Sequence, residues 1–195
     1  MLPKHGWFYF GVAYPVTLLA RWVFGLKVVG KKNIPKKGGV VLAYNHRSSL
    51  DPVFVLGTAG RKISFLAKIE LFRYPQGIIF RHLGLIPVDR SKKKNSDVTD
   101  TGAKALRAGT AIALAPEGTR NKTDILKPFK FGAVAMAERA NVPVVPIAIT
   151  GKFIPFFGKL KIEYGDPQMV SKGLESANEQ LRKSIENVIN KEKTK

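Results

Sequence analysis

Short apolar runs alternate along this chain with longer segments of helical character, and most of the runs end in a polar stretch. The clearest runs are VVLAY (40–44), KISFLA (62–67), LIPVD (85–89) and AIALAP (111–116). Runs that are apolar on both faces are typical of strands in a sheet that helices cover on each side. The alternation predicts a single α/β domain with a mostly parallel or mixed central sheet.

The remaining segments complete this expected layering. With 195 residues, 45% of them hydrophobic, the chain suits one sizeable core. Residues 142–150 predict a further strand, and residues 159–165, which alternate polar and apolar, predict an edge strand. Apolar residues at 174, 177, 181, 185 and 188 predict an amphipathic closing helix. Other helices are expected after Asp51, over 69–83 with a break near Pro75, over 96–108 and over 130–140.

The first segment is apolar and aromatic but interrupted. Residues 7–26 read WFYFGVAYPVTLLARWVFGL, in which Pro15 and Arg21 break a run that falls short of the ~20 apolar residues of a spanning helix. Its tryptophans and tyrosines favour the headgroup level of a bilayer. We therefore expect residues 1–27 to form an interfacial membrane anchor and residues 28–195 to form the α/β domain. A single tilted span and a helix packed inside the core are the alternatives.

The charge balance is strongly basic. The formal net charge is +19, and eight basic residues but no acidic ones precede Asp51. Such a field attracts anions, including nucleic acid, anionic lipid and acidic substrate carriers. The chain has no cysteine, which excludes disulfides, a thiolate nucleophile and cysteine-ligated zinc.

The stretch NHRSSLD (45–51) places a histidine and an aspartate directly after the first buried run. A histidine can act as a general base, and a carboxylate beside it orients its ring. On one regular helix, positions five apart lie about 140° from each other. His46 is therefore expected in the turn before the helix, where the curl of the chain brings it to Asp51. The alternative is structural, because Asp-Pro also forms a good helix N-cap.

Two other readings of this stretch are weaker. Ser48 and Ser49 lie too close to His46 for a familiar triad, and the sequence has no G-x-S-x-G elbow. One histidine and one aspartate supply too few ligands for a metal, so no metal site is predicted.

A second polar constellation, PEGTR (116–120), follows another strand. Gly118 permits a tight turn, Thr119 offers a hydroxyl, and the guanidinium of Arg120 fits phosphate. Arg90 and Lys68 also lie at predicted strand ends. Ligands in open α/β sheets bind at the carboxyl ends of strands, so we expect these cations to converge with His46 on a phosphate-bearing alcohol. A surface turn with a solvated Glu117–Arg120 pair is the alternative for PEGTR.

Four ordered segments resemble a known family. NHRSSLD is similar to the H-x4-D motif of the glycerolipid acyltransferases, GLIPVDR to their second motif, PEGTR to their third and VPVVPIAI to their fourth. The resemblance covers roughly residues 28–168, and the most similar subgroup is the bacterial 1-acyl-sn-glycerol-3-phosphate acyltransferases.

The resemblance implies transfer of a fatty acyl group from acyl-CoA or acyl carrier protein to the sn-2 hydroxyl of lysophosphatidic acid, giving phosphatidic acid. His46 and Asp51 would then be catalytic, and no metal or other cofactor is implied. The substrate-binding residues would be Lys68, Arg90, Glu117, Gly118, Thr119 and Arg120. The expected location is the cytoplasmic face of the cell membrane, in peripheral or monotopic association with its anionic surface.

Two alternatives stay open. The same family chemistry could act on another lysophospholipid or lipid acceptor, because the motifs select the reaction better than the substrate. A basic nucleic-acid-binding protein is the remote alternative: the charge fits, but the chain carries no groove-reading or RNA-binding signature, and no nucleic acid is expected as a partner.

Overall fold

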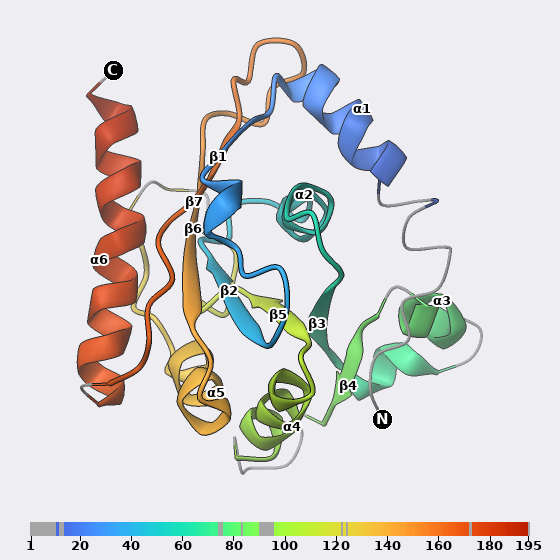
Figure 1. Cartoon of the computed structure of the whole chain (residues 1–195). Helices are drawn as coiled ribbons and strands as arrows, with labels where there is room; N and C mark the ends of the chain where they lie inside the picture. The colour runs from blue at the N-terminus through green and yellow to red at the C-terminus, as the bar shows by residue number, and fades with distance from the viewer. Residues whose placement is uncertain are drawn as a thin grey trace.

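A seven-stranded mixed sheet forms the centre of the protein (Figure 1). The structure is a computed structural model that describes residues 11, 14–73, 76–82, 84–89, 96–121, 123, 125–171 and 173–194. The strand order is β1-β7-β6-β2-β5-β3-β4. The strands are β1 (Lys27–Val29), β2 (Val40–Tyr44), β3 (Ile63–Lys68), β4 (Ile86–Val88), β5 (Ala111–Leu114), β6 (Val144–Thr150) and β7 (Lys161–Tyr164).

Strand direction divides the sheet into two parts. β6, β2, β5, β3 and β4 pair in parallel, so their carboxyl ends meet at one edge. β7 pairs antiparallel with β6 and parallel with β1, so these two strands run the opposite way. The predicted α/β class with a mostly parallel or mixed sheet is confirmed.

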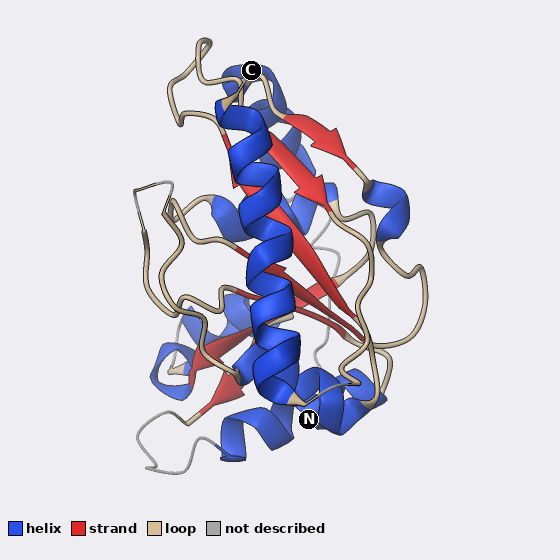
Figure 2. Cartoon of the chain, turned by 90° about the vertical axis from the view of Figure 1, so that its left-hand side faces the viewer, coloured by secondary structure: helices blue, strands red, loops and turns tan. Residues whose placement is uncertain are grey.

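Helices cover both faces of the sheet, as Figures 1 and 2 show. One face packs against α4, α5 and α6, and the other packs against α2, which α1 contacts from outside. The helices are α1 (Tyr14–Phe24), α2 (Asp51–Thr58), α3 (Gln76–His82), α4 (Ser96–Arg107), α5 (Gly132–Ala140) and α6 (Leu174–Lys193). Short 3-10 turns, η2 (Lys31–Asn33) and η3 (Ile69–Phe72), complete the elements.

The central strand β2 explains why the sequence reads as it does. All five of its residues are buried. Val41 and Ala43 pack with the α4–α6 side, whereas Val40, Leu42 and Tyr44 pack with the α2 side. Successive side chains of a strand point to opposite faces, so a strand covered on both sides must be apolar throughout.

The predicted closing helix is also confirmed. α6 lies across the strands in Figure 2, and its Leu181, Ile185 and Ile189 are buried against the core. Residues four apart fall on one helix face, so these three form an apolar stripe. Leu181 and Ile185 were among the predicted positions, whereas Ile189 is buried in addition to the predicted Val188, which is partly buried against the same core.

The prediction of an edge strand at 159–165 is wrong. β7 lies between β6 and β1, with Lys27 paired to Lys161. Its polar positions face neighbours: the ammonium of Lys161 lies 2.6 Å from carboxylates of both Glu163 and Glu192 of α6. Alternating polar and apolar residues show only that one side of a strand is polar. In β7 the polar side carries ion pairs and does not mark an exposed edge.

Part of the predicted anchor, residues 1–10 and 12–13, lies outside the described residues. Of the rest, 14–24 form α1, and Lys27 already belongs to β1. The predicted division between residues 27 and 28 stays a prediction. None of the helices in the described ranges combines the length and the apolar character needed to cross a bilayer.

Candidate active site

The turn that holds His46 and Asp51 and the PEGTR turn lie together where parallel strands end. β2 is flanked by β6 and β5, so the chain leaving β2 at Asn45 meets the turn after β5, which begins at Pro116, and the end of β6 at Thr150. This edge is the carboxyl edge of the parallel part of the sheet, where open α/β sheets bind their ligands.

Asn45 controls how the chain leaves β2. Its side-chain amide donates to the carbonyl of Ile149 at 3.0 Å, and its Oδ1 accepts from the Ile149 amide at 2.7 Å. The buried side chain thus takes the place of a strand partner for β6. The backbone is free to turn at His46 while the sheet stays hydrogen-bonded.

His46 and Asp51 form the central pair of the site. His46 Nδ1 lies 2.8 Å from Asp51 Oδ2, and the two side chains are 22% and 0% exposed. Oδ2 also accepts from the backbone amides of Arg47 and Ser48, each at 2.7 Å. The carboxylate therefore holds the whole turn from His46 to Ser48 as well as the imidazole.

The alternative in which Asp51 caps the following helix is wrong. The helix α2 begins at Asp51 itself, its N-cap is Leu50, and no side chain caps it. The carboxylate bonds backward to the preceding turn instead of forward to the helix amides. All three contacts fall on Oδ2, whereas Oδ1 is buried and has no hydrogen-bond partner among the described residues.

The pairing sets the protonation pattern of the imidazole. With Nδ1–H donated to a carboxylate, the neutral ring carries its lone pair on Nε2, the arrangement that a general base needs. Tyr44 lies edge-on to the His46 ring, with centroids 6.0 Å apart. Burial raises the pKa of the Tyr44 hydroxyl, and the charge of Asp51 raises it further, so Tyr44 stays neutral.

Glu117 joins the two turns. Its Oε1 accepts from the His46 amide at 3.0 Å, and its Oε2 accepts from the Asn121 side chain at 2.8 Å and the Lys127 amide at 3.1 Å. The backbone amide of Asn121 donates to the His46 carbonyl at 2.6 Å. Glu117 is only 4% exposed, so this buried carboxylate fixes the backbone of His46, whereas Asp51 contacts its ring.

The PEGTR turn after β5 has a cationic surface. Gly118, Thr119 and Arg120 are exposed, and Arg120 Nη1 donates to Ser49 Oγ at 2.8 Å. Lys127 Nζ lies 3.3 Å from Thr119 Oγ1 and 3.2 Å from the Arg120 carbonyl. These contacts place the Arg120 guanidinium and the Lys127 ammonium beside the histidine turn, and two such cations suit a phosphate.

Comparison with known proteins decides the family. The Acyltransferase family model matches residues 25–150. The chain belongs to the Acyltransferase family. The matched region of this family member contains the whole His46–Asp51 turn and the PEGTR turn, and it ends with β6.

Named relatives agree with this membership. The chain is 34% identical over 149 residues to the 1-acyl-sn-glycerol-3-phosphate acyltransferase of Bacillus subtilis, covering 73% of each chain. It is 32% identical over 135 residues to the protein of that name from Borreliella burgdorferi, covering 67% of this chain and 54% of the relative. The chain thus spans about half the length of that relative. It also spans 53% of a Mycoplasma genitalium relative to which it is 37% identical.

The fold of this acyltransferase family member has a solved counterpart. The crystal structure of the 1-acyl-sn-glycerophosphate (LPA) acyltransferase PlsC from Thermotoga maritima superposes with a TM-score of 0.79. The match covers 96% of this chain and 79% of that chain at 22% sequence identity. The α/β architecture is therefore shared across the whole described domain.

The predicted substrate-binding residues are placed unevenly. Arg120, Thr119 and Gly118 lie on the open side of the site, whereas Glu117 points inward and is bonded to protein groups. Lys68 ends β3 and is exposed at the same sheet edge. Arg90 follows β4 and lies outside the described residues. The assigned binding roles of all six residues remain predictions, and the geometry of Glu117 favours positioning over contact with substrate.

Three residues of the site, Asn45, Asn121 and Lys127, were not predicted from the sequence. Asn45 directly precedes His46 and Asn121 directly follows Arg120, yet an asparagine beside a turn carries no signal of its buried partners. Lys127 lies ten positions beyond Glu117, and only the return of the chain toward Pro116 brings it to the site.

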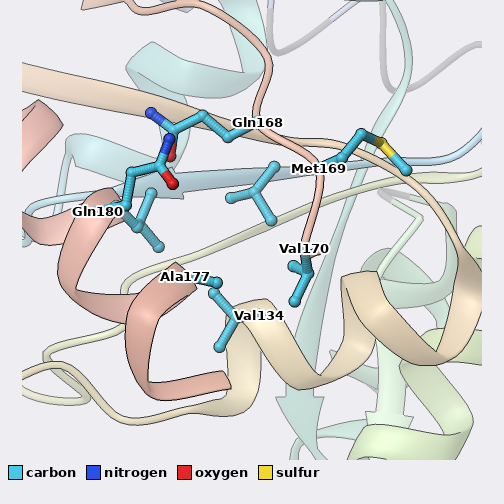
Figure 3. A pocket seen from close by; sticks show the side chains of 8 residues that line it. Val134, Gln168, Met169, Val170, Ala177 and Gln180 are labelled. Atoms are coloured by element: carbon cyan, nitrogen blue, oxygen red, sulfur yellow. The ribbon is translucent and has the colours of Figure 1, made fainter. Parts of the chain in front are cut away.

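Two hollows lie at different ends of the sheet. One, of about 400 Å³, lies at the ends of β3 and β4 and is lined by Ile69, Glu70, Phe72, Arg73, Arg81 and Asp89. The other, of about 10 Å³, lies between α5, α6 and residues 168–170 (Figure 3). It holds about one water molecule at most and borders Val144, at the amino end of β6, away from His46. Among the described residues, no group of three acidic or histidine side chains is arranged to hold a metal ion.

Proposed function

We propose that this chain transfers a fatty acyl group from an acyl thioester to the sn-2 hydroxyl of 1-acyl-glycerol-3-phosphate, giving phosphatidic acid. The observation that carries the proposal is the 2.8 Å contact between His46 and the fully buried Asp51, at the carboxyl edge of the sheet. A positioned base of this kind is what an alcohol needs to attack a thioester. The names of the relatives from Bacillus and Borreliella support the choice of acceptor.

In the proposed reaction, His46 Nε2 accepts the proton of the acceptor hydroxyl as its oxygen attacks the thioester carbonyl. Asp51 stabilises the imidazolium that forms. When the tetrahedral intermediate collapses, the C–S bond breaks, and the thiolate leaves and is protonated, which returns His46 to the neutral state. The nucleophile is the substrate hydroxyl, so no acyl-enzyme is formed.

The acceptor phosphate would lie over the PEGTR turn. Arg120 is exposed there and is steadied by Ser49, while Lys127 adds a second cation on the same turn. Fixed cations bind a phosphate strongly because charge-assisted hydrogen bonds are about twice as strong as neutral ones. Lys68 and Arg90, at the ends of β3 and β4, would extend this binding surface.

The donor and the location are part of the proposal. Acyl-CoA and acyl carrier protein are both acidic, and the +19 charge of the chain would attract either one and an anionic membrane surface. We place the protein at the cytoplasmic face of the cell membrane, where lysophosphatidic acid and the donor meet. The reaction as written uses no metal, so dialysis against EDTA should leave turnover unchanged.

Replacement of the base tests the mechanism. His46→Ala should lower turnover with lysophosphatidic acid by ~10²- to 10⁴-fold, the usual contribution of a positioned proton acceptor. His82→Ala is the matched control, because His82 lies on α3 and its Nδ1 contacts only the Ile78 carbonyl among the contacts described. Near-normal turnover in folded His46→Ala would overturn the mechanism. Both donors should be assayed, since each is compatible with the site.

A second assay tests the acceptor. Arg120→Ala should chiefly raise KM for lysophosphatidic acid, because the guanidinium contacts the phosphate before and during the reaction. The same variant should raise KM less for an acceptor whose phosphate carries a choline, because that phosphate bears only about one negative charge. Faster turnover of wild-type protein with such an acceptor would favour the alternative in which another lysophospholipid is the substrate.

A further inference from the structure

A second apolar surface lies on the segment between β6 and β7. Ile154, Phe156 and Phe157 are 47%, 64% and 81% exposed. Single exposed apolar residues are normal on a soluble surface, but a contiguous group marks an interaction site. The aromatic anchor predicted from the sequence lies only in residues 1–27, so it does not include this segment.

The segment is joined to α1, which lies far from it in the sequence. The Phe156 ring packs edge-on against Trp22 with centroids 5.4 Å apart, and the Phe156 amide donates to the Val23 carbonyl at 2.5 Å. The Leu160 amide donates to the Phe24 carbonyl at 3.1 Å. Figure 1 shows this loop arching beside the end of α1. The exposed side chains of both elements form what we call the aromatic surface: Leu18, Leu19, Trp22, Ile154, Phe156 and Phe157.

The backbone of the loop holds this shape at a conformational cost. Phe156 has φ 63° and Lys159 has φ 44°, in the left-handed region that side chains other than glycine rarely adopt. The Lys152 amide closes the loop by donating to the Gly158 carbonyl at 2.8 Å. Strained backbone persists where the surrounding structure enforces it, often at functional sites. Here it keeps Phe157 outward while Phe156 contacts Trp22.

α1 is fixed with its apolar side outward. A Cβ on Gly57 of α2 would lie 1.6 Å from Thr17 Oγ1, so the two helices approach closely at these residues. Thr17 is 2% exposed, and Phe24, seven positions later on the same face, packs on Phe54 with ring centroids 5.9 Å apart. Trp22 is left 73% exposed on another face of the helix.

The charges around the aromatic surface indicate an anionic bilayer as its partner. Arg21, Lys27, Lys152 and Lys159 are exposed beside the apolar side chains, and residues 151–160 contain no acidic residue. Aromatic rings at the headgroup level with a basic rim are typical of interfacial membrane binding. The exposed cations on both elements therefore favour an anionic lipid surface as the partner.

We propose that the loop over residues 152–158 inserts Ile154, Phe156 and Phe157 into the interface of an anionic lipid bilayer, beside α1. Lipid binding by the loop stands independently of the reaction. Its consequence for catalysis rests on the proposed function, because the acceptor would be delivered from that same bilayer.

The base of the loop reaches the histidine turn. Arg47 Nη1 donates to the Gly151 carbonyl at 2.7 Å. The Phe153 ring stacks on Phe54 of α2 at 6.0 Å, and α2 begins at Asp51. The groups that root the loop therefore also support the turn that holds the catalytic pair. Docking of the loop would orient His46 relative to the membrane plane.

Vesicle flotation of the full chain tests the proposal. Vesicles of phosphatidylglycerol and phosphatidylcholine in equal parts are the probe. Ile154→Ser combined with Phe157→Ser should lower the partition coefficient by roughly tenfold or more, because two large side chains lose apolar contact. Both residues are exposed, so the melting temperature should stay close to that of the wild type. Phe157→Trp should retain binding, since tryptophan also favours the interface.

Met169→Ser is the matched control. Met169 is 51% exposed but follows β7 in the chain, whereas the loop precedes β7, so its replacement should not alter flotation. Equal flotation of the loop variant and the wild type would overturn the proposal. So would a loop variant that changes only self-association, because the aromatic surface would then be an interface between copies.

Activity separates this proposal from the proposed function. The loop variant should turn over a short-chain, water-soluble lysophosphatidate at the wild-type rate and a vesicle-borne acceptor several-fold more slowly. Wild-type protein that acylates neither acceptor would refute the proposed function and leave the flotation result standing. Equal slowing of the loop variant on both acceptors would refute the orienting role of the loop.

Discussion

Replacing Asp51 by asparagine isolates the charge of the catalytic pair from its shape. Asp51 Oδ2 accepts from His46 Nδ1 at 2.8 Å and from the amides of Arg47 and Ser48 at 2.7 Å. An asparagine carbonyl oxygen can accept the same three hydrogen bonds. The turn should therefore keep its geometry while the imidazolium that forms in the reaction loses its counter-charge.

The size of the effect follows from this geometry. The imidazolium charge is spread over the ring, so its centre lies about 4 Å from the carboxylate charge, where two unit charges interact by about 4 kcal/mol at an effective dielectric constant of 20. At ~1.4 kcal/mol per factor of ten, Asp51→Asn should lower turnover by ~10³-fold. KM for the acceptor should change little, because Asp51 is completely buried and cannot contact the acceptor.

Turnover can be followed by release of the donor thiol, with lysophosphatidic acid as acceptor. Asp100→Asn is the matched control, because Asp100 lies on α4 and is 64% exposed. Thermal melting should place both variants within a few degrees of the wild type.

A folded Asp51→Asn protein with turnover within about threefold of the wild type would refute the counter-charge role. A large rise in KM at constant turnover would refute it as well, because the loss would then lie in binding.

Further predictions concern the β5 turn. Glu117→Gln should lower turnover by ~10-fold or more and lower the melting temperature. The reason is that one side-chain amide cannot accept from the His46 and Lys127 backbone amides as well as from Asn121. Unchanged steady-state kinetics would refute the positioning role of Glu117. Gly118→Ala should destabilise the fold by ~1–2 kcal/mol, because Gly118 has φ 72°. Differential scanning calorimetry checks this, and a melting temperature at or above the wild-type value would contradict it. The new Cβ would lie 2.9 Å from Lys130 Nζ, but this flexible side chain can move away.

Local pattern was enough for the strands that meet at the site. β2, β5 and β6 are apolar on both faces because both faces are buried, so each was visible as a continuous run without knowledge of its partners. The His46–Asp51 contact was also predictable, since five residues of a tight turn bring their ends together whatever surrounds them.

Contacts between segments far apart in the chain could not be predicted from the sequence. Glu117 was predicted to bind substrate, which stays a prediction, but its bond to a backbone amide 71 positions away was not predicted. The polar alternation of β7 was read as exposure at an edge, yet β1 and α6 cover that strand. In both cases the side chain is satisfied by a group whose position depends on the order of strands, which no local pattern contains.

By itself, then, the sequence determined the layered α/β architecture, the strands that carry the site and the histidine–aspartate pair. These features depend on burial periodicity and on residues close together in the chain. Only the tertiary structure decided which oxygen of Asp51 holds the turn, that Glu117 binds the His46 backbone amide, and that the 152–158 loop joins α1 in the aromatic surface. Each of these results from packing between segments that are far apart in the chain. Hydrogen-bond and ring contacts have short range, so the identity of the residues alone could not assign them.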